Sequence, residues 1–267
     1  HEFAESQPKE RMFSRFVILA LSLGTAAAFV PAPKLPSFSS HHAVSGISME
    51  TKSDLVTLAG KCNPVVKYFD PLGLAEQNFW GKSEEATIGF LRHAEIKHGR
   101  VAMFAFVGFC AQSNGVKWPW AMTLDGTPFP SADGVPAAQW DAIPAVAKWQ
   151  IVCAIAIFEL WGEGAMGSHY MKGGKPGYFP PFNGGDVEFP HPVPFNLYDP
   201  FNFSKKASDE KKAAGLVKEI NNGRLAMLGI FGFMAESKIE GSVPAIAGKI
   251  AHYDGDYMAP FEANFHF

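Results

Sequence analysis

The feature that most constrains this chain is an internal repeat. Residues 95–109 (EIKHGRVAMFAFVGF) align without a gap to residues 219–233 (EINNGRLAMLGIFGF), and 8 of the 15 positions are identical. In each copy a polar start leads into an apolar stretch, with no charged residue over residues 101–111 or residues 225–235. A repeat of this kind indicates two similar structural units in one chain.

The charged residues inside each copy predict how the two copies meet. Each copy can form a helix of roughly 20 residues or more, long enough to span a bilayer, where ionisable groups persist only if they pair or bind something. Glu95 and Arg100 lie roughly 140° apart around such a helix, which is a poor geometry for pairing within it. If the copies cross about a two-fold axis, Glu95 meets Arg224 and Glu219 meets Arg100. The spacing therefore predicts a reciprocal pair of ion pairs.

The symmetry of this crossing also constrains the number of spans. A two-fold axis along the membrane normal requires both copies to cross in the same direction, so an odd number of spans must separate them. The mostly apolar residues 145–166, with Lys148 near their start, supply one such span. The sequence predicts an all-α membrane protein with three transmembrane helices, at roughly residues 85–113, 144–166 and 207–238, the first and third crossed about a pseudo-two-fold. A short amphipathic helix is expected over residues 244–252.

The residues before the first span have the composition of a targeting address. Residues 1–11 precede Met12 and are expected to be an upstream extension or remnant. Residues 12–28 resemble a signal peptide, with a basic residue, an apolar run and small residues in that order. Residues 29–50 are nearly free of acidic side chains and resemble a transit peptide. We therefore expect a single domain over residues 51–267. By the positive-inside bias, the lysines between the second and third spans place that loop on the same side as the amino terminus.

Composition excludes several function classes. The net charge of −3 gives no reason to expect a nucleic-acid partner. Cys62, Cys110 and Cys153 form no CxxC pair, and we expect them to pack as small apolar residues. The sequence contains no G-x-S-x-G elbow, P-loop or HExxH motif, so we expect no enzyme.

The repeat extends upstream of the helices into two loops. Asp70-Pro71 stands in the sequence FDPLGL before the first helix, and Asp199-Pro200 stands in YDPFNF before the third. An Asp-Pro pair favours an extended residue followed by a turn. Each copy is therefore expected to enter its helix through the same kind of turn.

The side chains of the repeated helices are suited to holding a metal through single ligands. Glu95 and His98 have the Glu-x-x-His spacing of di-iron helix bundles, but the second copy has Asn222 in place of the histidine, and only three spans are available. The alternative is magnesium in a chlorin ring, which already has four nitrogen ligands and needs one more from the protein. A glutamate neutralised by an arginine, a histidine nitrogen and an amide oxygen all qualify. The same kinds of group recur at Gln112, Gln150, Glu159 and Glu236.

These motifs carry a resemblance to a known family. With AEIKHGRVAM and KEINNGRLAM preceded by FDPLGL and YDPFNF, the sequence resembles the light-harvesting chlorophyll-binding proteins, in the chlorophyll a/c and carotenoid antenna branch of algae with complex plastids. The resemblance covers roughly residues 65–255. It implies a three-helix membrane fold whose crossed helices hold two carotenoids near the loops of Asp70, Pro71, Asp199 and Pro200. It also implies chlorophyll a, chlorophyll c and carotenoids of the peridinin, fucoxanthin or diadinoxanthin type as cofactors.

The resemblance implies a set of magnesium ligands, residue by residue. Glu95, His98, Glu219 and Asn222 match chlorophyll ligands of the family, with Arg100 and Arg224 as the paired cations. Gln112 and Glu159 match positions used in the chlorophyll a/c branch, and Gln150 is a further candidate. Glu236 stands where relatives often have glutamine, and His252 lies near a carboxy-terminal histidine ligand of plant relatives. Glu163 and His169 are expected to be surface groups.

The expected function is that of an antenna subunit that absorbs light and passes excitation to a photosystem, photosystem I being favoured over photosystem II. Photosystem core subunits, neighbouring antenna subunits and thylakoid lipids would be its partners, in a thylakoid membrane with a stromal amino terminus and a lumenal carboxy terminus. A photoprotective quencher of the same fold is the nearest alternative. An alternative of another class is a small transporter with parallel repeats, which would be colourless.

Overall fold

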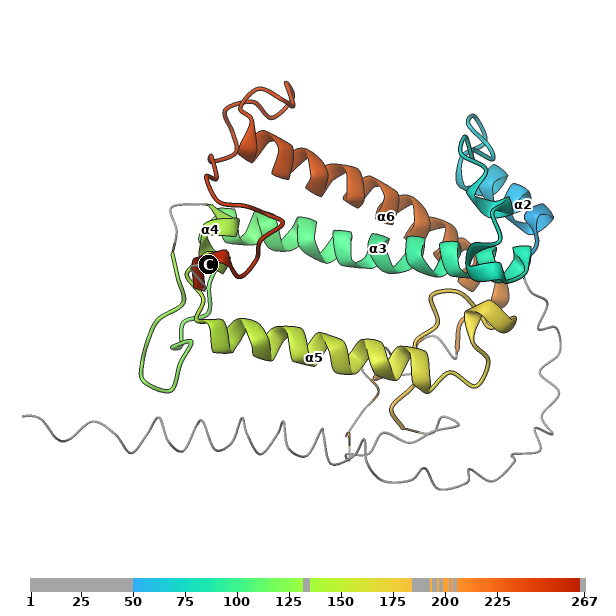
Figure 1. Ribbon diagram of the computed structural model, residues 1–267, viewed down its shortest axis with the longest axis horizontal. Helices are drawn as coiled ribbons and strands as arrows, with labels where there is room; N and C mark the ends of the chain where they lie inside the picture. Colours follow the sequence, from blue (N-terminus) through green and yellow to red (C-terminus); the bar gives the residue numbers. More distant parts are fainter. Residues whose placement is uncertain are drawn as a thin grey trace, which may run out of the picture. The chain divides into compact units, whose positions relative to one another are not determined.

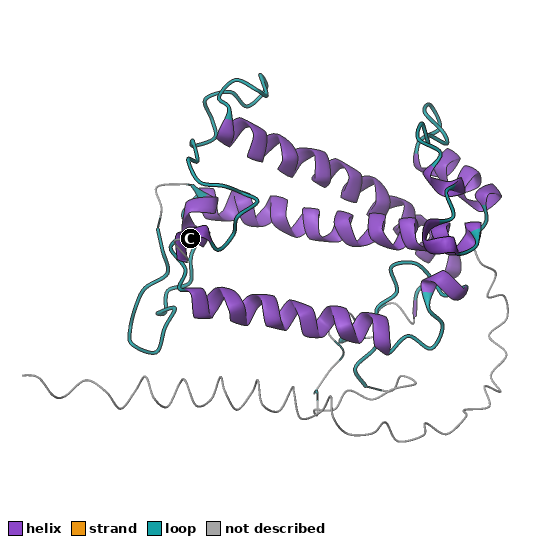
Figure 2. Cartoon of the chain, in the orientation of Figure 1, coloured by secondary structure: helices purple, strands orange, loops and turns teal. Residues whose placement is uncertain are grey.

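A computed structural model describes residues 50–131, 135–183, 193, 196, 199–201, 203 and 206–264, all within the unit Gly46–Phe267. The expected extension, signal-like and transit-like segments lie outside the described residues. The structure is all-helical where it is described, with no strand in these ranges (Figures 1 and 2). Three long helices dominate: α3 (Glu84–Ser113), α5 (Ala145–Gly164) and α6 (Asp209–Lys238). The shorter elements are α2 (Lys52–Cys62), η1 (Leu74–Glu76), η2 (Phe79–Gly81), α4 (Pro136–Asp141), η3 (Tyr170–Lys172) and η5 (Glu262–Asn264).

The two repeated helices start in the same way and have the same length. Ser83 caps α3 by accepting a hydrogen bond from the amide of Ala86, and Ser208 caps α6 by accepting one from the amide of Lys211. Two acidic residues follow each serine, where they complement the positive end of the helix dipole. Both helices contain 30 residues, which gives each a length of about 45 Å.

Helices α3 and α6 cross at a pair of glycines that occupy equivalent positions in the repeat. A Cβ atom added to Gly99 would lie 3.0 Å from the Cα of Gly223, and one added to Gly223 would lie 2.9 Å from the Cα of Gly99. The two backbones are therefore in direct contact, as is usual where helices pack closely in membranes. Figure 1 shows α3 and α6 lying side by side.

Helix α5 differs from this pair in composition and in its surroundings. It is the one helix in the described ranges that is long and apolar enough to cross a membrane by itself, with a mean hydropathy of 1.4, and only 17% of its apolar window is buried. Its start is fixed by Lys148, which is fully buried: Nζ donates to Asn264 Oδ1 at 2.5 Å and to the carbonyl of Asp141 at 3.4 Å. Trp140 Nε1 also donates to the carbonyl of Pro260 at 2.7 Å. The carboxy-terminal segment thus holds the beginning of α5.

The short amphipathic helix expected over residues 244–252 is not formed. The chain there makes turns, in which the amide of Ile246 bonds to the carbonyl of Val243 and the amide of Lys249 to the carbonyl of Ile246, both at 3.0 Å. Gly248 has a φ of +69°, a left-handed conformation that glycine adopts readily and that ends a helical run. Pro244 and Gly248 interrupt the backbone before a helix can form, and most of these residues are exposed.

The glycine contact makes a direct prediction about packing. Gly99→Ala should force the two backbones apart and destabilise the protein by about 1–3 kcal/mol, because overpacking a tight contact strains it. Gly108→Ala is the matched control, since nothing lies within 4 Å of a Cβ at that position and alanine favours helix. The measurement is the midpoint of thermal unfolding, followed by circular dichroism. Equal midpoints for the two variants would contradict the close contact.

Candidate functional site

The crossing of α3 and α6 brings together the four charged residues that the repeat singles out. Arg100 Nε lies 2.6 Å from Glu219 Oε1, and Arg224 Nη2 lies 2.7 Å from Glu95 Oε1. These are the reciprocal contacts expected from the sequence, and they flank the glycine contact on either side. About a quarter of each glutamate side chain is exposed, so both carboxylates sit half-buried beside a countercharge from the opposite helix.

Glu95 has a second arginine that the repeat does not indicate. Arg92 is 5% exposed, and its Nη1 lies 2.6 Å from Glu95 Oε2, while its Nε lies 3.3 Å from Glu50 Oε2. Arg100 in turn donates from Nη1 to the carbonyl of Gly177 at 2.6 Å. The two copies are therefore not electrostatically equal, since Glu95 lies between two guanidinium groups. The spacing of three residues between Arg92 and Glu95 is a signal that could have shown this pair.

His98 is exposed on α3, and its ring is oriented by the helix itself. Nδ1 lies 2.8 Å from the carbonyl of Ala94. Because a carbonyl only accepts, Nδ1 must carry the proton, which leaves the lone pair of the neutral ring on Nε2. Asn222, the equivalent residue on α6, is also exposed. Both copies therefore present, one turn from the ion pairs, an uncharged atom with a lone pair that can bind a metal.

Gln112 and Gln150 likewise lie on exposed faces of α3 and α5. The backbone carbonyl of Gln112 accepts from Gln139 Nε2 at 3.1 Å, which connects the end of α3 to α4. Exposed amides on otherwise apolar helices are costly in lipid unless they bind something.

Glu159, on α5, is paired with a lysine of α3. Lys97 Nζ lies 2.5 Å from Glu159 Oε2 and 3.5 Å from Glu163 Oε1. The sequence repeat gave no indication of Lys97, because the equivalent residue of the second copy is Asn221. Asn221 instead donates from Nδ2 to the carbonyl of Cys62 at 3.0 Å and so contacts the end of α2.

Glu163 is exposed, as expected of a surface group, and His169 is half-buried, but both also belong to a polar cluster. Glu163 accepts hydrogen bonds from His169 Nε2 at 2.9 Å and from the Tyr170 hydroxyl at 3.2 Å. Tyr170 stacks on the buried ring of His93, with centroids 3.9 Å apart, and the Nδ1 of His93 accepts from the amide of Gly177. Burial, assisted by the nearby Glu163 carboxylate, raises the pKa of Tyr170 to about 12, so its hydroxyl stays protonated and donates. The cluster fixes the end of α5 against α3.

Glu236 has a different role from the ligand role expected for it. The side chain is 2% exposed, and its two oxygens accept from the amides of Gly241 and Val243, each at 2.9 Å. Ser242 Oγ adds a longer contact of 3.4 Å. The carboxylate therefore closes the turn after α6 and has no face left for a planar ring. Its residue type suggests a ligand, but the backbone amides of the following turn bind both of its oxygens.

His252 lies in the segment after α6 and outside the helices. It is exposed, and its Nε2 lies 3.0 Å from Asp254 Oδ1. Its Nε2 therefore has an exposed carboxylate as its neighbour.

The two Asp-Pro loops share a local structure. Asp70 Oδ1 accepts from the amide of Leu74 at 2.9 Å, and Asp199 Oδ1 accepts from the amide of Phe203 at 2.8 Å. The spacing of four residues is the same in both loops. In the first loop the amides of Ala75 and Leu74 hold the pKa of Asp70 below its usual range, so the carboxylate stays charged. The repeat therefore extends into the structure of these turns.

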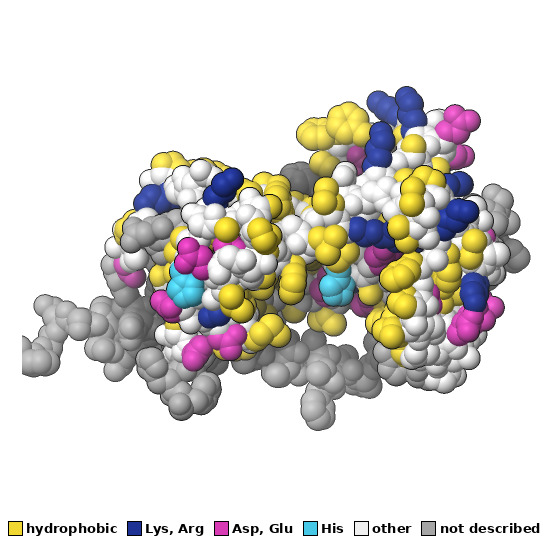
Figure 3. Space-filling view, turned by 90° about the horizontal axis from the view of Figure 1, so that it is seen from above, with side chains coloured by type: hydrophobic (Ala, Val, Ile, Leu, Met, Phe, Trp, Pro, Cys, Tyr) yellow, Lys and Arg dark blue, Asp and Glu magenta, His cyan; other side chains and the backbone are white. Residues whose placement is uncertain are grey.

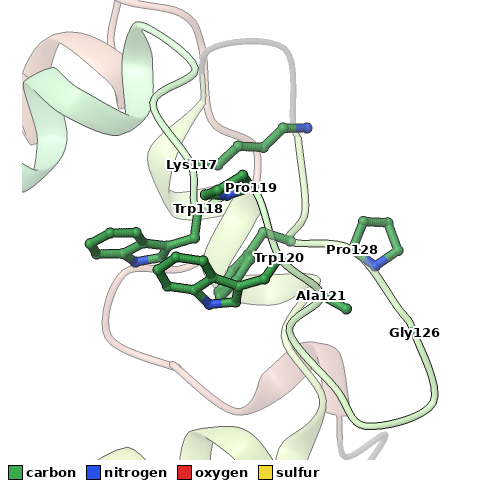
Figure 4. Close-up of a pocket in the computed structure, with 8 residues that line it drawn as sticks. Lys117, Trp118, Pro119, Trp120, Ala121, Gly126 and Pro128 are labelled. Carbon is green, nitrogen blue, oxygen red and sulfur yellow. The ribbon is translucent and has the colours of Figure 1, made fainter.

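One pocket lies apart from all of these residues, in the loop after α3. It measures about 440 Å³ and is lined by Lys117, Trp118, Pro119, Trp120, Ala121, Gly126, Pro128 and Phe129. Figure 4 shows the indoles of Trp118 and Trp120 stacked on one another, with centroids 4.7 Å apart. No ligand candidate from the sequence lines this pocket.

Comparison with known proteins identifies the family to which these features belong. The family model described as Chlorophyll A-B binding protein matches residues 55–238, well over half of the chain. The chain belongs to the chlorophyll a-b binding protein family. The matched range contains the crossed helices, both ion pairs and α5, and ends before His252.

Several relatives resemble the chain over most of its length. It is 32% identical to the chloroplastic fucoxanthin-chlorophyll a-c binding protein of Trieres chinensis over 87% of this chain and 98% of the relative. It is 31% identical to the fucoxanthin-chlorophyll a-c binding protein F of Phaeodactylum tricornutum, over 84% and 96% of the two chains. A relative from Macrocystis pyrifera is 30% identical over 66% of this chain. The chlorophyll a/c antenna branch expected from the motifs is confirmed.

The reciprocal pairs predict that neither glutamate tolerates the loss of its arginine. Arg100→Leu leaves Glu219 without its countercharge, which costs about 3–5 kcal/mol where such a pair is buried. We expect refolding of this variant with pigments to yield little complex. Lys211→Leu is the control, because it removes the same charge from an exposed position near the start of α6. The yield of pigmented complex, measured by sucrose-gradient separation, decides the matter, and equal yields for the two variants would refute the pairing.

Proposed function

We propose that this protein is a light-harvesting antenna subunit that binds chlorophyll a, chlorophyll c and fucoxanthin and passes excitation energy to a photosystem. The observation that carries the proposal is a set of charge-neutral ligand groups on exposed helix faces, in a chain of the chlorophyll a-b binding family. The relatives are named for fucoxanthin and chlorophylls a and c, and this favours fucoxanthin over peridinin or diadinoxanthin as the main carotenoid. Photosystem I is the acceptor to be tested first. The transporter alternative finds no support in the family.

The residues present fit the magnesium of a chlorophyll. His98 exposes Nε2 with its lone pair, and the glutamates at the helix crossing are neutralised by arginines, so neither needs to bring a net charge into the site. We propose seven ligands on the three long helices: Glu95, His98, Gln112, Gln150, Glu159, Glu219 and Asn222. Glu236 and His252 are left out, because the first is buried under a turn and the second is paired with Asp254. When bound, chlorophyll and carotenoid supply the light absorption, and the chain supplies the ligands and the spacing.

The proposal includes three membrane spans, α3, α5 and α6, with the first and third related by a pseudo-two-fold. Equivalent positions of the repeat support it, since the outward side chains of α3 and α6 are large, apolar and exposed in matched pairs. These are Val101 and Leu225, Phe104 and Leu228, and Val107 and Phe231, each at least 66% exposed. On the face seen in Figure 3, a mostly uncharged band separates two groups of charged side chains. A helix of about 45 Å exceeds the hydrocarbon thickness of about 30 Å, so its charged first turns can lie outside the lipid core.

We place the protein in the thylakoid membrane of a plastid. The amino terminus and the lysine-bearing loop between α5 and α6 would face the stroma, and the carboxy terminus the lumen, as the positive-inside bias requires. Photosystem core subunits, other antenna subunits and thylakoid lipids are the partners that this placement implies.

The proposed function is tested by the pigments that the purified protein carries. Purification of the protein from its plastid, followed by pigment extraction and chromatography, should give chlorophyll a, chlorophyll c and fucoxanthin. Excitation of the carotenoid band should produce chlorophyll a fluorescence, because the pigments are held at fixed distances. Comigration with photosystem I on native gels tests the acceptor. A colourless protein would contradict the antenna function, and comigration with photosystem II would correct the acceptor alone.

The ligand role of His98 generates a separate prediction. His98→Leu removes the nitrogen lone pair and should lose about one chlorophyll per chain. His98→Asn should keep the full complement, because Asn222 fills the equivalent place in the second copy. His252→Leu is the control and should also keep every chlorophyll. The chlorophyll-to-protein ratio after refolding with pigments is the measurement, and a full complement in the leucine variant at His98 would refute the assignment.

A further inference from the structure

One side chain of α3, Lys97, contacts two carboxylates of α5. Lys97 reaches from α3 to α5, where its Nζ lies 2.5 Å from Glu159 and 3.5 Å from Glu163. The two carboxylates differ in what else surrounds them. Glu163 also accepts from His169 and from the Tyr170 hydroxyl, so it retains hydrogen bonds without the lysine. Glu159 has no such additional partner among the contacts of the described residues, and over half of its side chain is exposed on an apolar helix.

The contact between Lys97 and Glu159 resembles the two arginine–glutamate pairs at the helix crossing. In each case a glutamate on one long helix is paired with a cation from another: Glu95 with Arg224, Glu219 with Arg100, and Glu159 with Lys97. An unpaired carboxylate facing lipid is expensive, and a pair of opposite charges lowers that cost. A paired carboxylate still has a free lone pair on its oxygens to bind a metal.

The two copies of the repeat differ at the position of Lys97, and this difference supports a specific role for Lys97 beside Glu159. Position 97 in the first copy is a lysine, and the equivalent position 221 in the second copy is an asparagine. Helix α3 has a glutamate of α5 within reach of this position, whereas Asn221 on α6 contacts a backbone carbonyl at the end of α2. The cation therefore occurs in the copy that faces the third glutamate.

We propose that Lys97 is a positioning residue: it supplies the countercharge that allows Glu159 to hold the magnesium of a chlorophyll on α5. The proposal rests on the function proposed above and deepens it, since it names the residue on which one ligand depends. Lys97 does not itself contact the pigment. Its effect passes through the charge and the orientation of the Glu159 carboxylate.

The test compares five variants refolded with the extracted pigments. Three are single variants: Lys97→Met, Glu159→Leu and Glu159→Gln. Two are double variants, which combine Lys97→Met with either Glu159→Gln or Glu163→Gln. Methionine keeps the length and apolar stem of lysine without its charge, and glutamine keeps an oxygen ligand without one. Chlorophyll content per chain is measured by pigment chromatography. The difference absorption spectrum at low temperature shows which chlorophyll is missing.

The expected pattern is specific to a countercharge. Glu159→Leu and Lys97→Met should each lose about one chlorophyll per chain, with the same difference spectrum. Glu159→Gln should keep its chlorophylls, and adding Lys97→Met to it should cause no further loss, because a neutral ligand needs no cation. Lys97→Met with Glu163→Gln should still lack the chlorophyll, since Glu163 is not the residue that requires Lys97.

Other outcomes would overturn the proposal. A full complement in Lys97→Met beside a loss in Glu159→Leu would show that Glu159 binds without the lysine. Recovery with Glu163→Gln rather than Glu159→Gln would move the role of Lys97 to Glu163. If Lys97→Met yields no complex at all, the double variant with Glu159→Gln still decides, because recovery supports the countercharge and failure refutes it. A full complement in Glu159→Leu would end this proposal and leave the antenna function standing, whereas a colourless wild-type protein would end both.

Discussion

The structure depends on a close contact between two backbones that is flanked by two ion pairs. Gly99 and Gly223 allow α3 and α6 to touch, and at that distance Arg100 reaches Glu219 while Arg224 reaches Glu95. Neither part is sufficient without the other, because a larger residue at the contact would separate the charges, and a half-buried charge without its partner is costly. The same contact that holds the helices together therefore places each carboxylate beside an arginine of the other helix, as the proposed ligand role requires.

The crossed pair follows from the sequence because its contacts are periodic. A repeat of Glu, Gly and Arg at fixed spacing places these residues on calculable faces of a helix, and a two-fold axis then decides which residue meets which. The loops at Asp70 and Asp199 follow in the same way, since an Asp-Pro pair determines its own local turn. The family resemblance rested on these same residues, and the match over residues 55–238 covers them.

The remaining contacts of the site could not be predicted because they join segments without a common period. Lys97 meets Glu159 only because the loop with η3 brings the end of α5 to α3, and no spacing within either helix indicates this. Glu236 was expected to face a pigment, but the amides of a turn five to seven residues later take its oxygens. Arg92 is an exception, because its distance of three residues from Glu95 is a helical spacing that could have been used.

The buried Lys148 has a consequence for the order in which the molecule is completed. Its ammonium group at the start of α5 is satisfied by Asn264, and Trp140 just before it bonds to Pro260. Both partners lie after α6 in the sequence, so they are synthesised after the three long helices. The middle helix can therefore acquire this anchor only after both crossed helices have been synthesised.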